Sequence, residues 1–200
     1  MRLSSVGPLV PKNTSWLRKT IGKFLLFTYR WHTEGEVYNS SKLILILAPH
    51  TSYWDFLTNM GTMLALGVQG QWLIAKEFCW WPLGYLLKWL GAIPIDRNIS
   101  QNIVIQMIDK INTSDKLLFA IYPEGATRKV MQWKTGFWHI AHTTGIPIQI
   151  LMVDYSTRSS TFGSVIKTSG DVDKDMKIIQ NQFKGVQPKN PENFGGEYLI

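Results

Sequence analysis

Residues 43–56 of the chain read Leu-Ile-Leu-Ile-Leu-Ala-Pro-His-Thr-Ser-Tyr-Trp-Asp-Phe. The apolar run at 43–47 is typical of a short buried strand, and the residues after it begin a helical pattern. His50 therefore stands at a strand end, with Asp55 about one helical turn into the next element. A carboxylate there can accept one imidazole N–H and leave the other nitrogen free to take a proton. We interpret the pair as a candidate base and its orienter; a chance surface pair is the alternative.

Three further segments carry short motifs beside apolar runs. The first comprises Ala-Lys-Glu at residues 75–77, Pro-Leu-Gly at 82–84 and Leu-Gly-Ala-Ile-Pro-Ile-Asp-Arg at 90–97. The second is Ile-Tyr-Pro-Glu-Gly-Ala-Thr-Arg at 121–128, and the third is Gly-Ile-Pro-Ile-Gln-Ile at 145–150. With the His-x-x-x-x-Asp element, their order and spacing resemble the four sequence blocks of the glycerolipid acyltransferases, the lysophosphatidate (1-acylglycerol-3-phosphate) acyltransferase family.

The resemblance extends over residues 42–155 and implies roles for individual side chains. It implies that His50 is the general base and that Asp55 orients it. It also implies that the phosphate of the acyl acceptor is bound by residues of the second and third blocks, namely Arg97, Glu124, Gly125, Thr127 and Arg128. The common family pattern is Pro-Glu-Gly-Thr-Arg, whereas this chain has one extra residue, Ala126, before the threonine.

The residue types at this implied anion site suit a phosphate. Arg97 and Arg128 could form charge-assisted, forked hydrogen bonds with it, and Gly125 would let backbone N–H groups approach it closely. We expect Glu124 to orient an arginine or a glycerol hydroxyl rather than to touch phosphate. For Arg97 the alternative is a surface ion pair with Asp96, and for Arg128 it is a solvated charge in a loop. Two lysines are weaker candidates for the same site, Lys76 and Lys134.

Acyl transfer from a thioester to a lipid hydroxyl requires deprotonation of the alcohol as it attacks. A neutral His50 beside the hydroxyl can take this proton. The chain has no Gly-x-Ser-x-Gly motif, which argues against a serine hydrolase. We therefore expect direct attack without a covalent intermediate, as the resemblance also implies. Acyl-CoA or an acyl carrier protein would be the co-substrate, with no cofactor and no metal, because the four histidines and single cysteine form no convincing ligand set.

The net charge of +7 and the isoelectric point near 9.5 imply an anionic partner. Nucleic acid is not expected, because the chain has no long Lys/Arg cluster, zinc-finger pattern or aromatic RNA-binding signature. An anionic membrane surface and a lysophospholipid substrate explain the same charge. The nine tryptophans also favour a membrane interface, although they could simply be core residues.

Residues 16–31 predict an amphipathic helix. One half of the wheel carries Trp16, Leu17, Ile21, Phe24, Leu25, Phe27 and Trp31. The other half carries Arg18, Lys19, Lys23 and Arg30. This pattern is typical of a helix lying in a bilayer interface with its cations toward lipid phosphates. A surface helix that packs its apolar face on the domain is the alternative. We assign residues 1–35 to a membrane-associating segment on these grounds.

Strands alternate with helices along the rest of the chain, which predicts a single α/β domain with a largely parallel sheet flanked by helices, over residues 36–186. The predicted strands are 36–40, 43–48, 71–75, 92–95, 117–121 and 147–153. The predicted helices are 54–66, 80–90, 100–112 and 135–144. Residues 187–200 read as an irregular tail. Without a signal-peptide pattern or a long apolar run, we expect a cytoplasmic protein that associates peripherally with the membrane.

The acyl chain needs an apolar groove. Six residues in or just before the predicted helix at 80–90 could line it: Phe78, Trp80, Trp81, Leu86, Leu87 and Trp89. Ordinary core is the alternative for these residues. The favoured function is acyl transfer to a lysophospholipid, most plausibly 1-acylglycerol-3-phosphate. The alternative acceptor is another lysolipid, such as an aminoacyl lysolipid. A peripheral membrane-binding module of the same fold without catalysis is an alternative of a different class.

Overall fold

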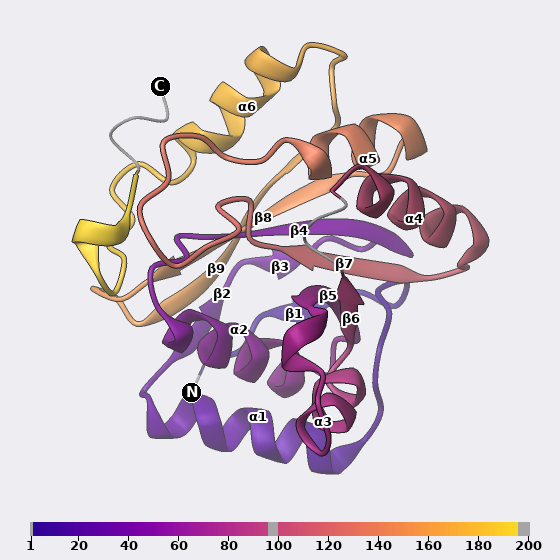
Figure 1. The fold of residues 1–200 in the computed structure, drawn as a ribbon. Coiled ribbons are helices and arrows are strands. Elements are labelled where there is room, and N and C mark those ends of the chain that lie inside the picture. The colour runs from indigo at the N-terminus through magenta and orange to yellow at the C-terminus, as the bar shows by residue number, and fades with distance from the viewer. Residues whose placement is uncertain (1, 96–99, 196–200) are drawn as a thin grey trace.

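A seven-stranded sheet between two layers of helices forms the centre of the computed structural model, which describes residues 2–95 and 100–195 (Figure 1). The strand order is β2-β9-β8-β4-β7-β5-β6. The strands are β2 (His32–Glu34), β4 (Lys42–Ala48), β5 (Gly70–Ala75), β6 (Ala92–Ile95), β7 (Leu117–Ile121), β8 (Ile148–Asp154) and β9 (Ser159–Ile166). All neighbouring pairs are parallel except β8 and β9. The α/β domain with a largely parallel sheet is confirmed.

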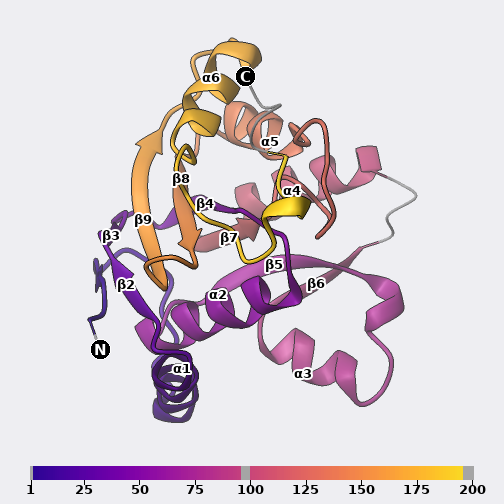
Figure 2. The same ribbon diagram turned by 90° about the vertical axis from the view of Figure 1, so that its left-hand side faces the viewer.

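Helices cover both faces of this sheet. Below it in Figure 1 lie α1 (Trp16–Thr28), α2 (Tyr53–Leu66) and α3 (Leu83–Trp89), and above it lie α4 (Ser100–Thr113), α5 (Gly136–Thr144) and α6 (Val172–Asn181). The quarter-turned view in Figure 2 shows the same division. Two short strands, β1 (Ser5–Val6) and β3 (Glu36–Val37), form a separate parallel pair. Two 3-10 turns complete the elements, η1 (Lys76–Phe78) and η2 (Pro191–Asn193). No helix of the described residues is long and apolar enough to span a bilayer.

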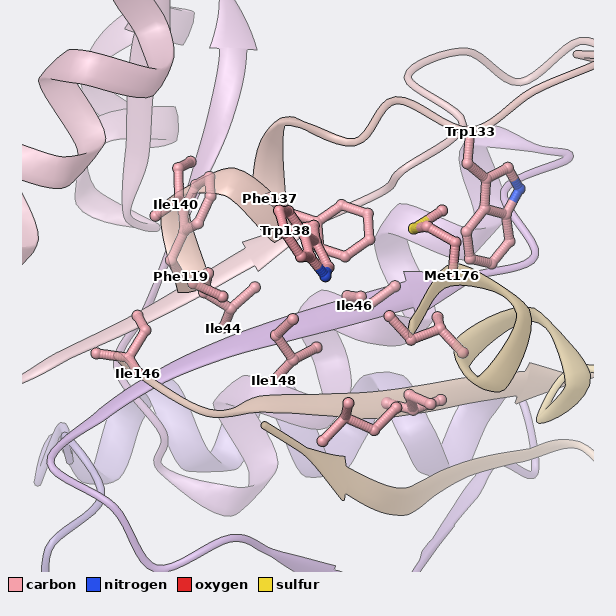
Figure 3. Packing of buried hydrophobic residues seen from close by; sticks show 14 of the residues in the cluster. Ile44, Ile46, Phe119, Trp133, Phe137, Trp138, Ile140, Ile146, Ile148 and Met176 are labelled. Atoms are coloured by element: carbon pink, nitrogen blue, oxygen red, sulfur yellow. The ribbon is translucent and has the colours of Figure 1, made fainter. Parts of the chain in front are cut away.

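Strand β4 lies in the middle of the sheet and is buried on both faces, which explains its uninterrupted apolar sequence. Its alternate side chains enter two different clusters. Ile44 and Ile46 meet Phe119 and Phe137 on the α5 side, as Figure 3 shows. The leucines of β4, namely Leu43, Leu45 and Leu47, join the cluster on the α2 side. Burial of each such side chain contributes roughly 1.5–3 kcal/mol to the free energy of unfolding. Strand β4 therefore fixes the position of the helices on both faces of the sheet.

Most predicted elements are present with shifted ends, but the region after β8 contains two elements that the sequence analysis does not predict. Strand β9 and helix α6 were not predicted. Strand β9 leaves part of its length exposed, so its apolar pattern is weak. Helix α6 is mainly polar, and its buried residues include Met176 and Ile179. The strand predicted at residues 36–40 is reduced to the two residues of β3.

The N-terminal segment is packed into the domain rather than attached beside it. Strand β2 pairs with β9 in the main sheet, and β1 pairs with β3 across the boundary suggested at residue 35. Three residues of α1 are buried and recur every four positions: Arg18, Gly22 and Leu26. Gly22 and Leu26 pack on α2, and Arg18 contacts Trp89 of α3. The expectation that Arg18 points toward lipid is therefore wrong, because its row is the one that faces the protein.

Helix α1 does not pack its predicted apolar face on the domain either. Five of the side chains on that face are exposed, with relative accessibilities of 38–75%: Trp16, Leu17, Ile21, Phe24 and Phe27. The alternative of an ordinary surface helix with a buried apolar face is thus wrong for most of its length. Only Trp31, at the end of the predicted segment, is fully buried among these rings.

Two glycines at the contact between α1 and α2 predict opposite effects of an added methyl group. A Cβ on Gly22 would lie 2.2 Å from the backbone nitrogen of Ala65. A Cβ on Gly61 would lie at an ordinary 3.4 Å from Leu25 and Leu26. We expect Gly22→Ala to destabilise by about 1–3 kcal/mol through overpacking. We expect Gly61→Ala to stabilise by up to about 1 kcal/mol through helix propensity.

Urea unfolding followed by circular dichroism measures both changes. Equal effects of the two substitutions would show that the close approach at Gly22 does not limit the packing of α1.

Candidate active site

The candidate site lies at the carboxyl ends of three adjacent strands. His50 and Asp55 follow β4, Glu124 follows β7, and Tyr155 follows β8, and these three strands are neighbours in the sheet. Parallel strands bring their carboxyl ends to one edge, which is where α/β sheets form binding sites. The site is therefore assembled from segments that are far apart in the sequence.

Asp55 is fully buried and surrounded by donors. Its Oδ2 accepts the backbone N–H groups of Thr51 at 2.7 Å and Ser52 at 2.8 Å. Its Oδ1 accepts the hydroxyl of Tyr155 at 2.7 Å. These bonds also begin helix α2, because Asp55 and Ser52 form a capping box. The carboxyl group is held in one orientation with its negative charge well compensated.

The imidazole of His50 lies against this carboxylate. Its Nδ1 is 3.5 Å from Asp55 Oδ2, and Nδ1 is buried without a hydrogen-bond partner among the described residues. The ring stacks on Tyr122, with centroids 3.8 Å apart and planes inclined by 19°. Stacking and the nearby carboxylate therefore fix the ring. Hydrogen bonds of catalytic groups are often long without substrate, and they shorten in the complex.

Two tyrosines keep the pair in place. Tyr122 donates its hydroxyl to the backbone carbonyl of Asp55 at 3.1 Å and accepts from the amide of Asn59 at 2.8 Å. Burial raises the pKa of Tyr122, and burial together with the Asp55 charge raises the pKa of Tyr155. Both hydroxyls therefore stay protonated near neutral pH and remain donors.

Glu124 supports the His50 loop from the opposite side. It is buried, and its two carboxyl oxygens accept the backbone N–H of His50 at 3.0 and 3.1 Å. Burial raises its pKa to about 7, against the lowering effect of the His50 hydrogen bond. The described structure thus gives Glu124 a partner that sequence reasoning did not consider, the backbone of the histidine itself.

The segment after residue 187 also reaches the His50 loop. Asn190 donates its backbone N–H to Thr51 Oγ1 at 3.2 Å and its side-chain amide to the Thr51 carbonyl at 3.0 Å. The ammonium of Lys189 lies over the rings of Trp54 at 4.7 Å and Tyr155 at 5.5 Å. Up to residue 195 this segment is irregular except for η2, and it is part of the site.

A cavity of about 1040 Å³ opens beside His50. Gly125 and Lys134 line it together with His50, and the lysine ammonium lies 3.2 Å from the position of a Cβ on Gly125. The backbone of Gly125 has a φ of 66°, which favours glycine. Its N–H donates to the Tyr122 carbonyl at 3.1 Å, so the turn itself uses the group that we expected to approach the anion.

The other predicted anion-binding residues are placed differently. Thr127 and Arg128 lie in the turn after Gly125 and are not among the described residues that line the cavity, and Arg128 is exposed. Arg97 lies outside the described residues. Lys134, a weaker candidate by sequence, is the lysine beside Gly125. Within residues 2–95 and 100–195, no three His, Cys, Asp or Glu side chains gather as a metal site would require.

The predicted acyl-groove residues also divide. Trp89 lines the cavity, and Leu87 is buried. The other four are exposed, with relative accessibilities of 49–77%: Phe78, Trp80, Trp81 and Leu86. For these four residues the alternative of ordinary core is wrong. The apolar cavity wall instead includes Met60, Met63 and Phe137, from the helices on both faces.

Sequence reasoning missed three residues that hold the site: Tyr122, Tyr155 and Asn190. The two tyrosines immediately follow strands β7 and β8, so the rule that sites form at strand carboxyl ends could have identified them. Asn190 has no comparable signal, because its contact depends on the path of a long irregular segment.

The sequence profile of the Acyltransferase family matches residues 30–153, and the chain belongs to that family. The fold is similar to the crystal structure of the 1-acyl-sn-glycerophosphate (LPA) acyltransferase PlsC from Thermotoga maritima. The TM-score is 0.61 and the sequence identity 14%, and the match covers 86% of this chain and 80% of that chain. At this identity the likeness concerns the fold alone. None of the curated proteins matches the chain.

The raised pKa of Glu124 predicts a pH-dependent stability. The folded protein keeps this proton up to a pH of about 7, whereas the unfolded chain releases it near 4.5. Between these values the folded state binds more protons, so the free energy of unfolding falls as pH rises. The slope is at most about 1.4 kcal/mol per pH unit. We expect the Glu124→Gln variant to lack this fall in the free energy of unfolding, because glutamine does not titrate. Urea unfolding at several pH values compares the two proteins, and parallel profiles would contradict the assignment.

The contact between Asn190 and Thr51 predicts an effect on the histidine loop. Asn190→Ala removes the side-chain hydrogen bond to the Thr51 carbonyl and leaves the fold largely intact. We expect kcat to fall about tenfold, a barrier increase of roughly 1.4 kcal/mol, with little change in the KM for the acyl donor. Asn181→Ala, at the end of α6, is the matched control. A rise of about tenfold in KM without a loss of kcat would instead assign Asn190 to substrate binding.

Proposed function

We propose that the protein transfers a fatty acyl group from acyl-CoA or an acyl carrier protein to the hydroxyl of a lysophospholipid, with 1-acylglycerol-3-phosphate as the preferred acceptor. The observation that carries this proposal is the buried pair of His50 and Asp55 beside a cavity of about 1040 Å³. Membership of the Acyltransferase family and the PlsC-like fold support it. In this proposal the protein is cytoplasmic and associates peripherally with the membrane.

In the proposed reaction His50 acts as the general base. Its Nε2 takes the proton of the acceptor hydroxyl while the oxygen attacks the thioester carbonyl, and Asp55 stabilises the imidazolium that forms. The carbon–sulfur bond then breaks, and the thiolate leaves and receives the proton from His50. General-base catalysis of this kind contributes roughly 10²–10⁴-fold. No acyl-enzyme intermediate is needed.

The cavity would hold the acyl tail, since apolar cavities of this size bury most of a ligand's surface. The acceptor phosphate would lie near Gly125, where Lys134 supplies a positive charge. The family resemblance adds Arg97, Thr127 and Arg128 to this site. A phosphate at that position would leave the glycerol hydroxyl facing His50.

We expect His50→Ala to abolish transfer while the protein stays folded. His139 also lines the cavity, but among the described residues it has no carboxylate partner comparable to Asp55. Asp55→Asn should lower kcat less, since an amide can still contact the ring but favours the wrong tautomer. The measurement is thioester consumption with and without lysophosphatidate. Circular dichroism and melting accompany it, because Asp55 also caps α2.

His142→Ala is the control, since this histidine is exposed and contacts Thr168. Near-normal turnover in His50→Ala would end the general-base assignment. Consumption without any acceptor would indicate a thioesterase, and consumption only with an aminoacyl lysolipid would change the acceptor. No consumption under any condition would leave a membrane-binding module without catalysis.

A further inference from the structure

Two segments that lie on the same side of the molecule carry exposed large apolar side chains. More than half of the exposed large hydrophobic residues among those described belong to α1 and to residues 78–89. The most prominent are 61–77% exposed: Trp16, Phe24, Phe27, Trp80, Trp81 and Tyr85. Figures 1 and 2 both show α1 and α3 on the lower side, away from α6. An apolar surface of this kind marks an interaction site.

The two segments are joined into one face. The guanidinium of Arg18 in α1 lies 4.1 Å above the ring of Trp89 in α3, and it donates a hydrogen bond to the Trp89 carbonyl. The close packing of α1 on α2 at Gly22 fixes the other side. The contacts of Arg18 and Gly22 therefore hold the two segments together, while the rings themselves stay exposed.

The charge of this face identifies its partner. The chain has no Asp or Glu before Glu34, although it has Lys and Arg residues throughout that stretch, and residues 78–89 contain Lys88 and no acid. Lys23 and Lys88 are exposed beside the rings. Trp and Tyr favour the boundary between lipid headgroups and acyl chains, and cations there attract anionic lipids. A second copy of the chain would bring two basic faces together, which like-charge repulsion opposes.

We infer that α1 and residues 78–89 form one docking face for an anionic bilayer, with Trp80, Trp81 and Tyr85 as a second contact besides α1. The sequence alone assigns Trp80 and Trp81 to an acyl groove or to the core. The cavity that His50 lines is also lined by Arg18, Lys88 and Trp89 at the junction of the two segments. Resting on the proposed function, docking of this face places the wall of the acyl cavity beside the lipid.

The experiment compares the parent with a variant carrying Trp80→Ser, Trp81→Ser and Tyr85→Ser. Co-sedimentation uses vesicles of phosphatidylglycerol and phosphatidylcholine in equal parts, and vesicles of phosphatidylcholine alone. We expect binding to the anionic vesicles to weaken at least about tenfold, the equivalent of 1.4 kcal/mol. Ile178→Ser on α6, also an exposed apolar side chain, is the matched control and should bind like the parent.

Charge is tested separately. Lys23→Glu should weaken binding and reduce its salt dependence, whereas Lys177→Glu, outside this face, should change both less. Lys88 is left unchanged because it lines the cavity. Arg18 is left unchanged because it holds the face together. All variants should keep transfer to a short-chain lysophosphatidate that is dispersed as monomers. The docking face and the catalytic proposal can therefore fail independently.

A second measurement uses the unmutated chain. Cys79 is the single cysteine and lies inside the second contact. A polarity-sensitive fluorophore on Cys79 should shift to the blue with anionic vesicles and not with phosphatidylcholine. An unchanged spectrum, or undiminished binding by the folded aromatic variant, would overturn the inference. A parent that is dimeric without lipid, and that the aromatic substitutions make monomeric, would overturn it in favour of self-association.

Discussion

The burial of the Asp55 carboxylate is the constraint on which the site depends. An unpaired charge inside a protein costs several kcal/mol, so each of its lone pairs must meet a donor. The Thr51 and Ser52 N–H groups and the Tyr155 hydroxyl supply them. The same bonds start α2, turn the chain sharply after β4 and leave His50 beside the carboxylate. The start of α2, the shape of the loop and the position of the His50 ring therefore depend on the same set of hydrogen bonds.

The remaining parts of the site act on the backbone of this turn rather than on the imidazole alone. Glu124 holds the N–H of His50, Asn190 holds the carbonyl of Thr51, and Tyr122 holds both the ring and the carbonyl of Asp55. Each comes from a different part of the chain. A turn fixed in this way loses little conformational freedom when substrate binds, which is how preorganised sites lower their barriers.

The sequence predicts well what local spacing determines. The apolar run of β4, the turn at His50 and the start of α2 follow from neighbouring residues, and the alternation of elements predicts the sheet. The contacts of Tyr155 and Asn190 span 100 and 139 residues, so no local pattern encodes them. The position of Arg128 could not be predicted from the family pattern because of the extra residue Ala126. One more residue in a turn changes the direction of every side chain that follows it. The exposed faces of α1 and residues 78–89 could not be told from core, since both need the same apolar residues.

The bond between Asn190 and Thr51 also sets the order in which the protein can mature. During synthesis the histidine turn leaves the ribosome long before Asn190 does, and the family's matched region is already complete by residue 153. A nascent chain of that length has the sheet's central strands but not the hydroxyl of Tyr155 or the amides that hold Thr51. The turn therefore reaches its final shape only when the segment that carries Asn190 folds back on it, after synthesis has continued well beyond the matched region.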